Sequence, residues 1–244
     1  MKICAVQLRL IAGDIAANLL KHIRCVEVAA AHGAELIYFS ELSLTAYEPS
    51  LAKTLAMTSV DTRLAVFQQL SDAHNLTIGV GLPMKRDEDV QIGMAWFEPK
   101  VSLSVYAKQQ LHSSELTYFV SGINQLVLTN NEHKIAPAIC YESLQSSHAD
   151  GAAKLGADIY LASVAKSANV LGKAIPHYPL VARQHHMFVM MANSVGVCDN
   201  WQSVQSAAWG RDGALLAQMD SESEGCVMLN TLTNKASIHL LEMA

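Results

Sequence analysis

The sequence lacks any uninterrupted apolar stretch long enough to cross a bilayer, although hydrophobic residues make up 51% of its 244 positions. Charged residues are few, at 16%, and neither an internal repeat nor a low-complexity linker is visible. A composition this apolar is typical of a chain that buries a large core. We therefore expect one soluble domain over residues 1–244, with no membrane partner.

A basic stripe of the kind that binds nucleic acid is also missing. The formal net charge is -5, and Lys and Arg are scattered along the chain. The start of the chain lacks a secretory core, because Gln7, Arg9 and Asp14 interrupt its apolar residues. We expect no nucleic-acid partner and a cytoplasmic location.

Closely spaced cysteine or histidine pairs of the metal-binding type are absent from the sequence as well. The five cysteines are far apart and odd in number: Cys4, Cys25, Cys140, Cys198 and Cys226. His185 and His186 are adjacent, but neighbours on a helix point in different directions. We expect reduced thiols, no metal and no cofactor, with all cysteines except Cys140 serving as small buried apolar residues.

Short apolar runs alternate with longer segments of helical periodicity, which indicates an α/β or layered α+β fold. The predicted strands are Lys2–Leu8, Leu36–Ser40, Leu76–Leu82, Met94–Phe97, Val101–Ala107, Ile135–Ile139, Asp158–Ser163, Phe188–Asn193 and Gly225–Leu229. Four helices are predicted. The first begins at Asp14 and ends near Gly33, and the others cover Ser59–Ala73, Ser143–Leu155 and Pro179–Met187.

Three further details of this pattern can be tested against a structure. Leu19, Ile23, Val26 and Ala30 recur at helical spacing and are expected on the buried face of the first helix. Residues 84–89 are expected to form a charged break between strands. A meander of strands is expected from residue 205 to residue 229, with its turn at residues 210–213.

Three chemically useful side chains follow predicted strands. Glu41 ends the run Leu36–Ser40, Lys108 follows Val101–Ala107, and Cys140 follows Ile135–Ile139. A thiol, a carboxylate and an ammonium that converge supply a nucleophile, a proton carrier and a fixed positive charge. This set is suited to attack on a carbon–nitrogen bond through a covalent intermediate.

The surroundings of these groups predict their protonation. Burial after an apolar run is expected to raise the pKa of Glu41 toward the range that is useful for proton transfer. Lys108 would favour both a thiolate and a developing oxyanion. Cys140 lies at a predicted strand-to-helix junction, where free backbone N–H groups are expected to lower the thiol pKa.

Motifs around these residues occur in a consistent order along the chain. They are Phe39-Ser40-Glu41-Leu42 with Thr45-Ala46-Tyr47-Glu48-Pro49, Tyr106-Ala107-Lys108 followed by Glu115 and Phe119, and Ile139-Cys140-Tyr141-Glu142. Supporting segments are Ala5-Val6-Gln7, Gly13-Asp14, Gly156-Ala157-Asp158, Ala182-Arg183, Ala192-Asn193 and Asp212-Gly213. Together they resemble the nitrilase superfamily of carbon–nitrogen hydrolases.

The resemblance implies a four-layer αββα sandwich, a layered α+β fold that usually pairs through its helical faces. A homodimer, or an assembly of dimers, is therefore expected, with Ser143–Leu155 and Pro179–Met187 as candidates for the paired face. The resemblance also implies a catalytic triad of Glu41, Lys108 and Cys140. It gives Glu115 a supporting role, and the backbone N–H of Tyr141 is expected to bind the oxyanion.

The expected function is hydrolysis of a small amide through a thioester, with release of ammonia and a carboxylate. Tyr47, Glu142, Ala165 and Lys166 are candidates for the substrate pocket, and Lys166 is expected either to bind a substrate carboxylate or to be solvated. A nitrilase, an N-carbamoyl amidohydrolase and a non-catalytic binding protein remain alternatives. We expect amides to react faster than nitriles, and the chain length resembles the compact amidase branches.

The sequence departs from the motifs of many small amidases of this superfamily at two places. Ser143-Leu144-Gln145 follows Glu142, where those relatives have an arginine, an aromatic residue and a proline. Ala46 stands where a glycine is commoner. The acyl group of the substrate is therefore not predicted from the resemblance.

Overall fold

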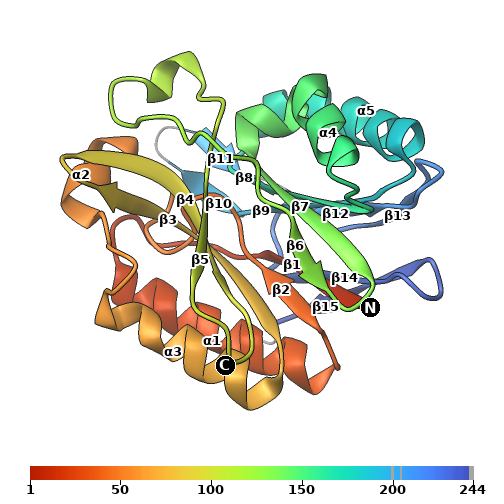
Figure 1. Cartoon of the computed structure of the whole chain (residues 1–244), viewed down its shortest axis with the longest axis horizontal. Helices are drawn as coiled ribbons and strands as arrows, with labels where there is room; N and C mark the ends of the chain where they lie inside the picture. Colours follow the sequence, from red (N-terminus) through yellow and green to blue (C-terminus); the bar gives the residue numbers. More distant parts are fainter. Residues whose placement is uncertain (199–200, 204, 242–244) are drawn as a thin grey trace.

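A computed structural model describes residues 1–198, 201–203 and 205–241, and two large mixed sheets dominate it (Figure 1). The first sheet contains β1 (Lys2–Gln7), β2 (Leu36–Tyr38), β3 (Thr77–Arg86), β4 (Asp89–Phe97), β5 (Ser104–Ala107), β14 (Gly225–Asn230) and β15 (Lys235–Leu240). Their spatial order is β15-β14-β1-β2-β3-β4-β5, and β1, β2 and β3 are parallel.

The second sheet is built from the middle and the end of the chain. It contains β6 (Leu128–Asn130), β7 (His133–Ile139), β8 (Ile159–Val164), β9 (Phe188–Asn193), β12 (Ala207–Trp209) and β13 (Leu215–Gln218). Their order is β13-β12-β9-β8-β7-β6, with β7, β8 and β9 parallel. A separate antiparallel ribbon joins β10 (Gly196–Cys198) to β11 (Trp201–Ser203).

Helices form the outer layers. They are α1 (Ile15–Ala31), α2 (Ala52–Leu55), α3 (Ala65–His74), α4 (Ser146–Lys154) and α5 (Ala168–His185), with short 3-10 turns η1 (Pro49–Leu51), η2 (Thr62–Leu64), η3 (Ser113–Glu115) and η4 (Cys140–Leu144). Figure 1 shows α1 and α3 on one side of the sheets and α4 and α5 on the other. Within the described residues, none of these helices has both the length and the apolar character that crossing a membrane requires.

The central strands are buried on both faces, and alternate residues face different cores. In β1, Ile3 packs between the two sheets, whereas Cys4 packs toward α1 and α3. In β8, Leu161 packs between the sheets and Tyr160 toward α4 and α5. Because successive side chains of a strand point to opposite faces, three cores separate four layers. The expected αββα sandwich is confirmed.

The buried face of α1 differs from the expected one. Leu19, Ile23 and Ala30 are only half buried, whereas Asn18 and His22 are completely buried. A polar side chain can be buried when it finds hydrogen-bond partners, and apolar periodicity does not reveal it. The partners of Asn18 and His22 lie in the loop that carries Glu41, described below.

The charged residues 84–89 are not a break between strands. Lys85 pairs with Val90 and Arg86 with Asp89, so that β3 and β4 form one long hairpin with its turn at residues 87–88. The side chains of Lys85 and Arg86 are exposed. The strands therefore continue past the edge of the core, where backbone pairing persists and charged side chains stay in water.

Two helices also differ from their predicted bounds. The helix expected at Ser143–Leu155 begins only at Ser146, because the residues after Cys140 form η4. The helix expected at Pro179–Met187 is the second half of α5, which contains both Pro176 and Pro179. Proline is commonest in the first turn of a helix, and here it misled the prediction of the helix start.

The C-terminal meander is correct only in part. β12 and β13 pair antiparallel around the expected turn, but β14 leaves this sheet and pairs with β1 in the other one. β15, which completes that edge, was not predicted, because most of its residues are at least partly exposed and show no clear alternation. Local pattern indicates a strand but does not identify its partner.

Candidate active site

Strand ends from both sheets converge on one region. Glu41 follows β2 by a short loop, Cys140 follows β7 directly, and Lys108 follows β5. The Glu41 and Lys108 side chains are completely buried. The structure therefore brings together the three residues that the sequence identified as candidates.

Lys108 lies between two carboxylates. Its Nζ donates hydrogen bonds to Glu41 Oε1 and to Glu115 Oε1, each at 2.7 Å. Burial lowers the pKa of Lys108, but the negative charges of Glu41, Cys140 and Glu115 outweigh burial and raise the pKa above its ordinary value. Lys108 is therefore held as an ammonium ion with a fixed position.

Glu41 is placed to exchange a proton with the thiol. Burial raises the pKa of its carboxyl group, while the positive charge of Lys108 and the nearby thiol of Cys140 act in the opposite direction. Oε1 is taken by Lys108, whereas Oε2 is buried and accepts no other hydrogen bond in the described part of the chain. A carboxylate with one constrained oxygen and one available oxygen can act as a general base.

Cys140 occupies the junction between β7 and η4. Its φ is 49°, a left-handed conformation that costs energy for a residue with a side chain. Its Sγ donates to Ala165 O at 3.7 Å. Burial and the nearby Glu41 raise the pKa of the thiol, and Lys166 and Lys108 counteract them. The prediction that the pKa of the Cys140 thiol is lowered is therefore wrong, because burial and the Glu41 carboxylate outweigh the effect expected from backbone N–H groups at the strand end.

The loop that carries Glu41 is fixed from two sides. Leu44 N donates to Gly81 O of β3 at 3.0 Å. From α1, Asn18 Nδ2 donates to Leu44 O at 3.1 Å, and His22 Nε2 is hydrogen-bonded to Ser43 Oγ at 2.9 Å. Burial lowers the pKa of His22 to about 4, so this ring is neutral. The buried polar residues of α1 thus serve to position the loop.

Glu115 is the second carboxylate in contact with Lys108. It is buried, and its Oε1 also accepts a hydrogen bond from Tyr47 OH at 3.0 Å. Its Oε2 accepts from His112 N at 2.7 Å. Glu115 therefore connects Lys108 to the pocket wall.

Glu142 does not line the pocket, contrary to expectation. It is completely buried, and its Oε1 accepts from Tyr106 OH at 2.6 Å and from Ile139 N at 2.7 Å. Its Oε2 accepts from Gln109 N at 2.7 Å and from Gln110 N at 3.2 Å. The carboxylate thus ties the segment after Lys108 to the strand that ends at Cys140.

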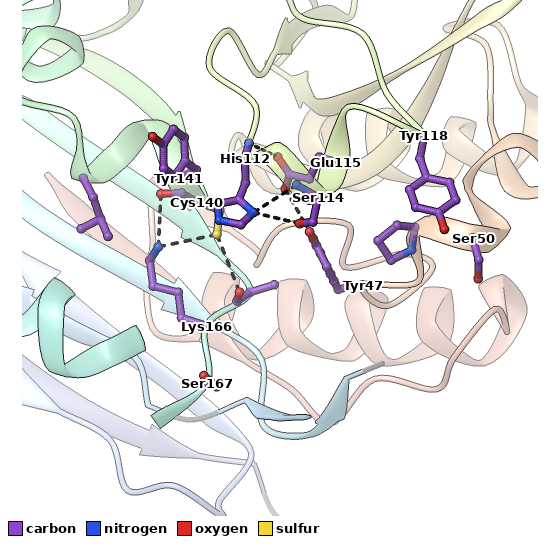
Figure 2. Close-up of a pocket in the computed structure, with 13 residues that line it drawn as sticks. Tyr47, Ser50, His112, Ser114, Glu115, Tyr118, Cys140, Tyr141, Lys166 and Ser167 are labelled. Atoms are coloured by element: carbon purple, nitrogen blue, oxygen red, sulfur yellow. Dashed lines mark hydrogen bonds between the residues drawn. The ribbon is translucent and has the colours of Figure 1, made fainter. Parts of the chain in front are cut away.

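A cavity of about 630 Å³ opens at Cys140. It is lined by Tyr47, Pro49, Ser50, His112, Ser114, Glu115, Tyr118, Cys140, Tyr141, Leu144, Ala165, Lys166 and Ser167. Figure 2 shows Tyr118 and Ser50 on the side of the pocket away from Cys140. Three of the four pocket candidates, Tyr47, Ala165 and Lys166, therefore lie in the wall.

The pocket residues His112, Ser114 and Tyr118 were missed by sequence reasoning. They lie in or next to η3, a 3-10 turn inside a long connection without apolar periodicity. Only their closeness to Glu115 in the sequence could have indicated them.

Lys166 is buried rather than solvated. It is 2% exposed, and its Nζ donates to Cys140 O at 3.2 Å and lies 3.6 Å from Cys140 Sγ. Figure 2 shows its side chain extending toward the thiol. Of the two expectations for this residue, solvation is therefore wrong.

No three His, Cys, Asp or Glu side chains among the described residues gather as a metal site would require. Cys4, Cys25 and Cys226 are buried free thiols, and the side chain of Cys198 lies outside the described part.

Solved structures with the same fold include an amidase, NitN, from Nesterenkonia sp. AN1. It is 21% identical, with a TM-score of 0.86, and 96% of each chain is covered. A glutamate-to-glutamine variant of the Nesterenkonia amidase, with acrylamide added to its active-site cysteine, has a TM-score of 0.87 at 20% identity, covering 94% of this chain and 92% of the other. A cysteine-to-alanine variant in complex with butyramide has a TM-score of 0.86 at 21% identity, covering 93% and 89%.

No curated protein sequence matches the chain. The family model for carbon-nitrogen hydrolases, however, matches residues 2–237, which include Glu41, Lys108 and Cys140. A match over nearly the whole chain, together with the sandwich and the convergent thiol, carboxylates and lysine, leads to one assignment: this chain belongs to the carbon-nitrogen hydrolase family.

Proposed function

We propose that the protein is an amidase that hydrolyses small amides through a thioester on Cys140. The observation that carries this proposal is the contact of Lys108 Nζ with Glu41 Oε1 at 2.7 Å beside the thiol of Cys140, which lines the cavity of about 630 Å³. A carboxylate available to the thiol and an ammonium fixed next to both form a complete unit for nucleophilic catalysis.

In the first half of the reaction, Glu41 removes the thiol proton as Cys140 Sγ attacks the amide carbon. The carbonyl electrons move to oxygen, where Lys108 and the backbone N–H of Tyr141 stabilise the negative charge. Glu41 then gives its proton to the leaving nitrogen as the carbon–nitrogen bond breaks. Ammonia departs, and the acyl group stays on Cys140 as a thioester.

In the second half, water attacks the thioester while Glu41 takes one of its protons. A second tetrahedral intermediate forms in the same oxyanion site and collapses with cleavage of the carbon–sulfur bond. Glu41 returns a proton to the departing thiolate sulfur, and the carboxylic acid leaves. Glu115 supports both halves by holding Lys108 in place.

The lining of the pocket supports an acyl group with an apolar part. The cavity of about 630 Å³ combines aromatic side chains with few charges. The Nesterenkonia amidase, which shares the fold, has been captured with butyramide and with acrylamide. We extend that chemistry to this chain as a proposal, and propose that amides react faster than nitriles, since a nitrile gives a nitrogen-centred adduct that needs further proton delivery.

The test is ammonia release from short aliphatic amides and from nitriles with matching side chains. The wild type should release ammonia faster from each amide than from its nitrile, and intact-mass measurement should detect an acyl adduct. Cys140→Ala should abolish both. Glu41→Gln and Lys108→Met should each lower kcat/KM by about 10³-fold or more, because replacing one member of a catalytic unit removes most of the catalysis that the whole unit provides.

Full turnover by Cys140→Ala would end the proposal. Faster release from nitriles would move the assignment to a nitrilase and leave the covalent mechanism in place. A loss of less than about tenfold in Glu41→Gln or Lys108→Met would show that the role of that residue is misassigned.

A further inference from the structure

A second lysine contacts the nucleophile. Lys166 reaches Cys140 from the end of β8, and its Nζ lies 3.2 Å from Cys140 O and 3.6 Å from Cys140 Sγ. In Figure 2 it approaches the sulfur from a different side than His112 and Tyr47. Lys166 is therefore a second lysine near the thiol, separate from Lys108 and its two carboxylate partners.

The backbone of Lys166 is fixed by Asn193. Lys166 N donates to Asn193 Oδ1 at 3.0 Å, and Asn193 Nδ2 donates back to Lys166 O at 2.9 Å. Asn193 is completely buried at the end of β9, and its own N donates to Ser206 Oγ at 3.0 Å. These backbone hydrogen bonds fix the point from which the Lys166 side chain extends toward the sulfur.

The charges around the thiol give this lysine a distinct task. The titratable groups that face Cys140 are Glu41, Tyr47, Lys108, Lys166 and Tyr178, and His177 faces Lys166. Lys108 shares its charge between two carboxylates, each 2.7 Å away. Lys166 opposes the rise in the pKa of the thiol more strongly than Lys108 does.

We propose that Lys166 is a catalytic residue that stabilises negative charge on Cys140 Sγ, while Lys108 serves the carboxylates and the oxyanion. The sulfur becomes negative twice. It does so first when Glu41 takes the thiol proton before the sulfur–carbon bond forms. It does so again when the carbon–sulfur bond of the second tetrahedral intermediate breaks and its electron pair returns to sulfur.

This inference rests on the proposed nucleophilic role of Cys140, but it can be tested without an amide substrate. 2-Iodoethanol, which carries no amide group, alkylates a thiolate with loss of iodide, so its second-order rate across pH reports the thiolate fraction. The rate is measured for wild type, Lys166→Gln and Lys166→Arg, with adducts assigned by peptide mass. Cys140→Ala gives the background from other cysteines, and Lys154→Met, an exposed lysine of α4, is the matched control.

Lys166→Gln keeps a hydrogen-bond donor for Cys140 O but removes the charge. We expect its Cys140 alkylation at neutral pH to be at least about tenfold slower, with the rate profile shifted to higher pH, because one pKa unit changes the thiolate fraction tenfold. Lys166→Arg should retain most of the rate, and Lys154→Met should match the wild type. Lys166→Met provides a second neutral variant should Lys166→Gln not fold, with folding checked by circular dichroism.

An unshifted alkylation profile in a folded neutral variant would overturn the proposal, even if amide hydrolysis were lost. In that case a higher KM for carboxylate-bearing amides, with unchanged thiol reactivity, would assign Lys166 to substrate binding instead. If the wild type hydrolysed no amide while the alkylation profile shifted as expected, the proposed function would fail and the role of Lys166 at the thiol would stand.

Discussion

At the scale of single residues, the candidate active site depends on the carboxyl group of Glu41, which is buried although only one of its oxygens accepts a hydrogen bond from Lys108. Glu41 has one oxygen on Lys108 and the other without a hydrogen bond from any other described residue. Burial disfavours its charge, while the lysine and the thiol favour it. Such a group can accept and release a proton within one catalytic cycle, and the proposed mechanism requires it to do so twice.

This balance predicts the acid limb of the pH profile. Glu41 must be ionised to take the thiol proton, and burial raises its pKa above the ordinary value of 4.5. As pH falls through that raised value the carboxylate is protonated, so kcat/KM should decline below an apparent pKa higher than 4.5. Initial rates with butyramide across pH would check this, with structure monitored by circular dichroism at each pH.

A profile that stays flat to pH 4.5 in folded protein would contradict this assignment. In Glu41→Gln the remaining activity should lose this acid limb, because the titrating group is gone.

At the scale of elements, β3 supports the catalytic loop through a residue without a side chain. A Cβ on Gly81 would lie 2.4 Å from Ser40 O and 2.7 Å from Leu42 N, the two neighbours of Glu41. Leu42 itself has a φ of 52°. The loop therefore lies so close to β3 that only glycine fits at position 81. This contact fixes the position of Glu41 relative to the strand.

We expect Gly81→Ala to destabilise the fold by about 1–3 kcal/mol, because backbone atoms must move to admit the methyl group. Its kcat should fall more than its KM rises, since the displaced residue is the proposed base. The matched control is Gly172→Ala in α5, where a Cβ would meet nothing within 4 Å. That substitution should be neutral or stabilise by up to about 1 kcal/mol.

Urea denaturation and steady-state kinetics of both variants would measure these effects. Equal stability and equal kcat for Gly81→Ala and wild type would show that the loop tolerates displacement.

At the scale of the whole molecule, the outer helical layer formed by α4 and α5 carries apolar side chains in water. Leu155 is 49% exposed and Leu180 is 52% exposed. Both belong to the segments for which the sequence suggested pairing between copies. We retain a homodimer through this face as a prediction.

Light scattering coupled to size exclusion should give a mass near twice 26.4 kDa at micromolar concentration. Leu180→Glu should shift the protein toward the monomer, because burying a charge at the centre of an interface is costly. Leu20→Glu is the control, since Leu20 is 68% exposed on α1 in the opposite layer. A monomeric wild type, or dissociation by the control alone, would refute pairing through this face.

Much of the site followed from local sequence. Glu41, Lys108 and Cys140 each follow an apolar run, and the ends of strands from the two sheets meet in one region. The strand Phe188–Asn193 has the expected bounds. These features were predictable because burial on both faces leaves a continuous apolar run in the sequence.

Other features depend on residues that are distant in the sequence. The sequence alone determined which groups are available for chemistry and where strands end, because both are properties of neighbouring residues. Only the tertiary structure decided that β14 crosses to the first sheet, that Glu142 is a buried tie and that Lys166 lies at the thiol. The partners in such contacts are chosen by packing and hydrogen bonding between segments, which no local period encodes.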